Sequence, residues 1–186
     1  MTIKITGPAS GDVLRAGPMT IRVLEDGSST GHRLGIAEIT IPPHLDGPPQ
    51  HVHRRHDETF YVLSGTPAFA SGSDTIQAKP GMLVIVPPGT PHTFANHGDE
   101  PAVMLFTTTP DLYIGYFREL SSQPPGPLDP AAVGQIMARY ATDLIPPHPW
   151  PAGPRPPSSA SPRTRMITKG RWRIKRQRRW SLGRPT

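Results

Sequence analysis

The chain has 186 residues, a formal net charge of +6, 26 prolines, 18 glycines and no cysteine. This length favours one domain with a short extension. Without cysteine, disulfides, thiolate zinc sites and thiol nucleophiles are excluded, so a metal ion would have only nitrogen and oxygen ligands. The many prolines and glycines, together with only 6% aromatic residues, favour an all-β body with many turns.

The positive charge is confined to the C-terminal part of the chain. Residues 1–148 carry 9 Lys and Arg against 14 Asp and Glu, whereas residues 149–186 carry 11 Lys and Arg and no acidic residue. We therefore predict two parts, a domain over 1–148 and a disordered, Pro/Arg-rich basic tail over 149–186. Arginine alternates with tryptophan in this tail, so contact with nucleic acid or an anionic membrane is an alternative to a tail without function.

The N-terminal residues lack the basic start and continuous apolar stretch of a secretory signal. No segment of the sequence approaches the roughly 18 apolar residues of a membrane span. The expected location is therefore cytoplasmic.

Short β-rich segments alternate with turn clusters at intervals of about ten residues between 19 and 109, which is typical of a β-sandwich or barrel. The clearest predicted strands are 19–25, 34–41, 58–65, 82–87 and 102–108. Because the runs at 61–63 and 82–87 are continuously apolar, we expect these strands to be covered on both faces or to lie at the centre of a barrel.

Helical patterns follow the last predicted strand. Apolar residues recur at every fourth position from 112 to 120. A second helical run, over 129–144, begins with Asp129 as the N-cap and Pro130 at the first helical position. Two short helices are therefore expected to close the domain.

A histidine-rich segment lies just before the predicted strand 58–65. His51 and His53 are two residues apart, so on an extended chain both side chains project from the same face and can chelate one ion. Glu58 follows after four residues that allow the chain to turn back. Imidazole and carboxylate ligands suit one divalent transition metal ion, namely Mn, Fe, Co, Ni, Cu or Zn.

A second segment, 81–96, leads from a buried strand through a proline-rich turn to His92, the natural fourth ligand. Strand alternation places Phe94 and Asn96 on the side of His92, and Phe60 and Val62 on the side of Glu58. The site is therefore expected to have an apolar wall that excludes water and accommodates an organic ligand.

Other polar residues near these segments are expected at the surface. His56 and His97 stand at positions outside the two ligand patterns, and surface exposure is the favoured interpretation for both. Arg54 and Arg55 are expected to form a solvated turn.

The two segments resemble the paired motifs of the cupin superfamily. The first motif, His-x-His, three or four residues, Glu, six residues and Gly, is matched by His51, His53, Glu58 and Gly65. The second motif is matched by Gly81, Pro87, Gly89, His92 and Asn96. One departure is Leu45, which stands where the first motif usually begins with glycine, with Gly47 nearby.

This resemblance implies a small cupin β-barrel, a double-stranded β-helix of the jelly-roll type, with its motif core at about residues 19–120. It also implies that His51, His53, Glu58 and His92 are the metal ligands. The chain looks most like single-domain bacterial cupins described as quercetin 2,3-dioxygenase-like. That likeness implies a mononuclear metal-dependent dioxygenase acting on an enol or flavonol-like substrate, with Glu58 both ligand and catalytic base.

Two other classes of function remain open. One is a non-catalytic small-molecule-binding or sensor protein, and the other is a nucleic-acid-associated protein that acts through its basic tail. The fold hosts many activities, so it does not select among them. Dimerisation through sheet edges is common in the family, which suggests a homodimer.

Overall fold

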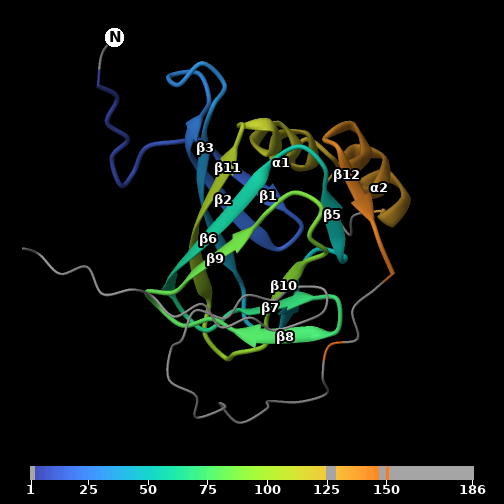
Figure 1. The fold of residues 1–186 in the computed structure, drawn as a ribbon. Coiled ribbons are helices and arrows are strands. Elements are labelled where there is room, and N and C mark those ends of the chain that lie inside the picture. Colours follow the sequence, from blue (N-terminus) through green and yellow to red (C-terminus); the bar gives the residue numbers. More distant parts are fainter. Residues whose placement is uncertain (1–2, 125–128, 147–149, 151–186) are drawn as a thin grey trace, which may run out of the picture.

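The computed structural model describes residues 3–124, 129–146 and 150 of the chain. Their strands form three antiparallel sheets that together make a β-barrel (Figure 1). The largest sheet has the order β1-β2-β3-β11-β6-β9. Its strands are β1 (Val13–Ala16), β2 (Met19–Asp26), β3 (Gly35–Ile41), β11 (Ala102–Thr109), β6 (Asp57–Ser64) and β9 (Leu83–Val86). All five predicted strands are therefore confirmed.

The second sheet has the order β4-β10-β7-β8 and the third pairs β12 with β5. The bounds are β4 (Leu45–Asp46), β10 (Thr93–Asn96), β7 (Ala68–Ser71), β8 (Asp74–Gln77), β12 (Thr142–Leu144) and β5 (His51–His53). The all-β prediction is confirmed, because the helices α1 (Leu112–Ser121) and α2 (Pro130–Arg139) are the only ones among the described residues.

A cluster of phenylalanines fills the barrel interior. The ring of Phe60 lies 5.3–5.6 Å, between centroids, from the rings of Phe69, Phe94 and Phe106. Aromatic pairs at such distances add to the stability that burial provides. Phe60 and Val62 both point inward from β6, so the predicted alternation along this strand is confirmed.

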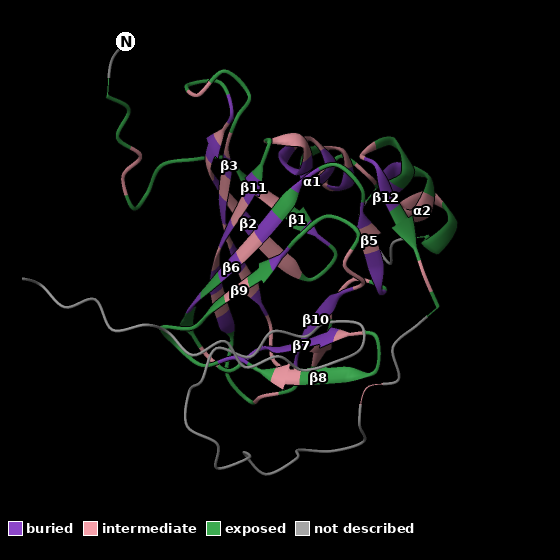
Figure 2. Cartoon of the chain, in the orientation of Figure 1, coloured by how far each residue is buried: buried purple, intermediate pink, exposed green. Residues whose placement is uncertain are grey.

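The expectation that strands 61–63 and 82–87 are covered on both faces was wrong. Leu83 is 54% and Ile85 is 60% exposed, and Tyr61, opposite Leu83, is also exposed. Figure 2 shows the colour of exposed residues on β9. β9 is the edge strand of its sheet, and no described element packs on its outer face. The homodimer expected through sheet edges stays a prediction.

The two predicted helices lie together at one end of the barrel, next to β12 and β5 (Figure 1). The side chain of Asp129 accepts hydrogen bonds from the backbone N–H groups of Ala131 and Ala132, as expected of an N-cap. Neither helix is long and apolar enough to cross a membrane.

The second helical run was predicted too long. α2 ends at Arg139, because Ala141 has a φ of +54° and cannot continue the helix. Residues 142–144 form β12 instead, and their backbone groups pair with β5. Pairing with a distant strand thus overrides the local helical pattern.

Most of the predicted basic tail lies outside the described residues. Trp150 is described, and its ring packs edge-on against the ring of His97, with 5.1 Å between centroids. The division at residue 148 and the disorder of 149–186 stay predictions.

We expect Phe60→Ala to lower the free energy of unfolding by about 3–5 kcal/mol, because it leaves a cavity in the aromatic cluster. Leu83→Ala on the paired strand β9 is the matched control, since Leu83 is half exposed, and it should cost far less. Urea unfolding of both variants measures the difference. Similar losses for the two would contradict the assigned inner and outer faces.

Candidate functional site

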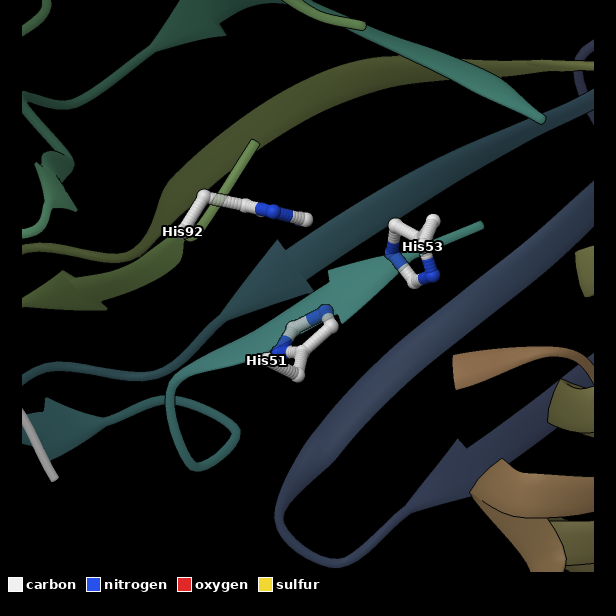
Figure 3. A group of neighbouring side chains, drawn as sticks. All are labelled: His51, His53 and His92. Atoms are coloured by element: carbon white, nitrogen blue, oxygen red, sulfur yellow. The ribbon is translucent and has the colours of Figure 1, made fainter. Parts of the chain in front are cut away.

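The four residues predicted as metal ligands lie together in the barrel interior. His51 and His53 come from β5, Glu58 from β6, and His92 from the turn just before β10. Each is at most 3% exposed. Figure 3 shows the imidazole rings of His51, His53 and His92 gathered in one place.

Backbone hydrogen bonds join the two histidine segments directly. The N–H of His51 donates to the carbonyl of His92 over 3.0 Å, and the N–H of His92 donates to the carbonyl of His51 over 2.9 Å. The N–H of Gly89, whose φ is +78°, donates to the carbonyl of His53 over 2.7 Å. The proline-rich turn therefore positions His92 against β5, and a residue with a side chain would strain that turn.

The departure at Leu45 leaves the ligands in place. Gly47 donates its N–H to the carbonyl of Phe94 over 3.1 Å, and a Cβ at this position would lie only 2.0 Å from that carbonyl oxygen. Gly47 thus allows β4 and β10 to approach closely at this point.

Hydrogen bonds to Nδ1 determine the tautomers of three histidines. Nδ1 of His51 lies 2.7 Å from the carbonyl oxygen of Pro49, and Nδ1 of His92 lies 3.1 Å from that of Thr90. A carbonyl only accepts, so both Nδ1 atoms carry the proton. Their Nε2 atoms therefore present lone pairs when these rings are neutral.

His53 has the same tautomer for a different reason. Its Nδ1 lies 2.8 Å from Oγ1 of Thr142, and that hydroxyl donates its one proton to the carbonyl of Tyr140 over 3.2 Å. The hydroxyl must therefore accept from His53, whose Nε2 is left with a lone pair.

These nitrogen atoms converge with the carboxylate of Glu58. The donor atoms of His51, His53 and His92 all lie within 4.8 Å of one another. Nε2 of His53 and Nε2 of His92 each lie 3.1 Å from an oxygen of Glu58. An ion with bonds of about 2.1 Å has neighbouring ligand atoms roughly 3.0–3.4 Å apart, so the two 3.1 Å contacts with Glu58 fit a metal ion.

Burial also keeps these groups in the protonation states that bind metal. Desolvation lowers the pKa of His51, and the positive charges of His92 and His53 lower it further. Desolvation likewise lowers the pKa of His53. Burial acts to raise the pKa of Glu58, but His53, His56 and His92 outweigh it and hold this pKa well below its usual value. His51 and His53 are thus held as neutral imidazoles and Glu58 as an ionised carboxylate.

The surface position expected for His56 was wrong. His56 is only 1% exposed, and its ring lies 4.1 Å from that of His53 and 5.0 Å from that of Tyr113, between centroids. Arg54 and Arg55 in the same turn are exposed, as expected. His56 turns inward because α1 covers this part of the barrel with Tyr113.

A cavity of about 30 Å³ adjoins the site, room for only two or three water-sized molecules. Its lining residues are Ala16, Met19, Ile39, Pro48, His51, Glu58, Phe60, Phe94, Phe106, Tyr113, Tyr116, Phe117 and Leu120. The expected apolar wall is therefore present, with Phe60 and Phe94 in it. Asn96 lies elsewhere and donates to the carbonyls of Ile41 and Pro42, so its role is structural.

Sequence reasoning missed three residues of the site. Thr142 gives no signal of its own, because its role depends on the pairing of β12 with β5. Tyr113 reaches the site from α1, and burial raises its pKa well above the usual value, so its hydroxyl stays neutral. His56 could have been suspected from its place between His53 and Glu58.

Comparison with known proteins identifies the fold. Residues 37–108 match the family model described as a cupin domain. The uncharacterized protein MJ1618 of Methanocaldococcus jannaschii is 30% identical over 60 residues, which make up 32% of this chain and 48% of that protein. The chain thus spans about half the length of this curated relative.

Two solved structures resemble the chain closely enough to compare folds. KdgF from Halomonas sp. has a TM-score of 0.51 at 19% identity, over 59% of this chain and 94% of that one. A predicted oxalate decarboxylase from Thermotoga maritima has a TM-score of 0.50 at 16% identity, over 58% and 98% of the two chains. At these identities the likeness shows the fold alone, and it confirms the predicted cupin jelly roll.

We expect Thr142→Val to weaken metal binding about 10–100-fold, because it removes the acceptor that orients His53. Thr59→Val is the matched control, since the hydroxyl of Thr59 bonds Thr107 on the outer side of the same barrel. The metal affinity of each variant is measured by letting the protein compete with a chelator for the ion. Equal affinities would contradict the orienting role of Thr142.

The metal-free protein should lose stability as the pH falls below about 6.5. The folded-state pKa values of His51 and His53 lie below the ordinary 6.5, so the unfolded chain binds more protons there and stability rises with pH. Each histidine contributes a slope of up to about 1.4 kcal/mol per pH unit. Urea midpoints between pH 7 and 5 measure the slope. His51→Gln should reduce it, whereas the exposed His44→Gln should not.

Proposed function

We propose that this chain, in which residues 37–108 form a cupin domain, binds one divalent transition metal ion and oxidises a small organic substrate with O2. The ligands in this proposal are His51, His53, Glu58 and His92. The observation that carries it is the buried set of lone pairs, in which imidazole nitrogens and a carboxylate face one another at 3.1 Å. Such atoms repel unless a proton or cation lies between them.

The chemistry of the ligands limits the choice of ion. Nitrogen and oxygen donors suit Mn, Fe, Co, Ni, Cu and Zn. Zinc has no redox chemistry, so the oxidation favours the other five. When bound, such an ion supplies a Lewis acid for a substrate oxygen and the electron transfer that O2 requires.

The size of the cavity bears on the substrate. At about 30 Å³ the cavity has room for a molecule as small as O2, but not for a flavonol unless α1 moves. The phenylalanines that line it would exclude water from the reacting groups. We therefore favour a small enol as the substrate over a flavonol.

Glu58 has two roles in this proposal, and its pKa bears on their order. A carboxylate with a lowered pKa is ionised at neutral pH, as a ligand must be, but it is a weak base. Holding the ion is therefore its first role. Removal of a proton from a substrate hydroxyl is the second.

A non-catalytic binding or sensor protein is the second candidate. The narrow cavity favours a binding protein, because a buried site with little room suits a small ligand that stays bound rather than a substrate that is exchanged. The names of the two similar structures, KdgF and a predicted oxalate decarboxylase, describe different proteins, so the fold selects no reaction. The nucleic-acid candidate depends on the basic tail, which lies outside the described residues apart from Trp150.

Elemental analysis and O2 consumption separate the two main candidates. We expect one metal ion per chain in the purified protein and O2 uptake with a small enol. A metal-loaded protein that takes up no O2 with enols or flavonols, yet melts at a higher temperature with one of them, would favour the binding protein.

We expect His92→Ala to weaken metal binding severely, because three of the four ligands remain and the coordination is incomplete. His97→Ala is the matched control. His92 comes just before β10 and His97 just after it, but His97 is exposed and pairs with Asp46. Metal content and chelator competition measure both. Unchanged affinity in His92→Ala would refute the assigned ligand set.

Glu58→Asp should reduce turnover even when metal is supplied in excess. The shorter side chain keeps the charge but withdraws the oxygen by about one methylene, so proton transfer is misplaced. Turnover of a substrate found in the O2 assay is measured at saturating metal. A rate equal to that of the parent would rule out the base role and leave ligation intact.

A further inference from the structure

His56 differs from the other three histidines of the site. Those three have Nδ1 held by an acceptor, whereas neither nitrogen of His56 makes a hydrogen bond in the structure. The side chain is nevertheless fully buried. Burying a polar group without a partner costs roughly 1–3 kcal/mol, so a partner outside the protein is indicated.

The position of His56 matches that of a ligand. Its Nε2 lies 3.4 Å from Oε1 of Glu58, and Nε2 of His53 lies 3.1 Å from the same oxygen. His53, His56 and Glu58 form a second group whose donor atoms all lie within 4.8 Å of one another. The two separations from Oε1 of Glu58, 3.4 and 3.1 Å, fall in the range of about 3.0–3.4 Å between neighbouring ligands of one ion.

The two groups of potential ligands share an atom. His53 belongs both to the group with His51 and His92 and to the group with His56 and Glu58. Nδ1 of His53 makes a hydrogen bond with Thr142, so only Nε2 of His53 is free to bind metal. One lone pair binds one ion at a time, so the two groups cannot hold separate ions through His53, and a single ion there would draw the other ligands of both groups toward it.

We propose that His56 is a fifth ligand of this ion, beside His51, His53, Glu58 and His92. The inference rests on the proposed metal binding and extends it. Five protein ligands would leave fewer positions on the ion open to substrate or O2 than four would. The site would then suit a substrate that binds through one atom, which agrees with the small cavity.

The test compares His56→Leu with His97→Leu as the control, since His97 is exposed. Leucine fills most of the space of imidazole and cannot bind metal. We expect the metal-free His56→Leu protein to remain folded, because leucine keeps the packing against Tyr113 and only the 3.4 Å contact with Glu58 is lost. Its affinity for Cu²⁺, measured by chelator competition, should fall at least about 10-fold. Its Co²⁺ complex should show shifted visible bands.

A second pair of variants, Glu58→Gln alone and Glu58→Gln with His56→Leu, distinguishes direct binding of the ion by His56 from an effect of His56 on Glu58. If His56 binds the ion itself, His56→Leu should weaken Cu²⁺ binding in the Glu58→Gln background as well. Cu²⁺ is the tightest-binding ion of its series, so binding through the remaining histidines stays measurable. No further loss in that background would overturn direct ligation.

The remaining outcomes are distinct. If the parent protein binds no divalent ion, the proposed function fails and this inference fails with it. If the parent binds one ion and His56→Leu keeps its affinity and its Co²⁺ spectrum, only the inference is overturned. Two ions per chain would overturn the single shared site.

Discussion

Mutual repulsion among buried lone pairs is the constraint on which the centre of this protein depends. Three imidazoles have Nδ1 bound to an acceptor and Nε2 left for a ligand, and the ionised carboxylate of Glu58 lies 3.1 Å from Nε2 of two of them. Water does not screen these groups, because each is at most 3% exposed. Without a cation or shared proton the arrangement opposes folding, so the barrel must hold it in place by interactions elsewhere.

Those interactions are mostly made by the backbone. Carbonyls of Pro49 and Thr90 hold two imidazoles, and reciprocal hydrogen bonds join His51 to His92. Backbone acceptors cannot change their protonation state, so they determine the tautomers of these two rings whenever the rings are neutral. The third imidazole depends on a side chain, Thr142, and on the short strand β12 that carries it. This histidine is therefore the one whose orientation is most open to change by substitution.

The strands and the four motif residues could be predicted because local rules determine them. Alternation along β6 placed Phe60 and Val62 on the inner side, and the spacing of His51 and His53 placed both on one face. Local rules failed where tertiary pairing decides. Residues 142–144 follow a helical pattern but pair with β5, and the apolar run at 82–87 lies at an edge that no single-sequence pattern reveals. His56 was misplaced for the same reason, because α1 covers it from 57 residues further along the chain.

At α1, the packing that stabilises the barrel also limits how large a molecule can enter the cavity beside Glu58. Tyr113, Tyr116 and Phe117 belong to the hydrophobic core, and the same side chains line the cavity beside Glu58. Enlarging the cavity by moving α1 would expose these rings, and burying one large side chain contributes about 1.5–3 kcal/mol. A substrate larger than the cavity would have to supply that free energy through its own binding. A small substrate avoids the cost, so the packing that stabilises the barrel also selects for size at the site.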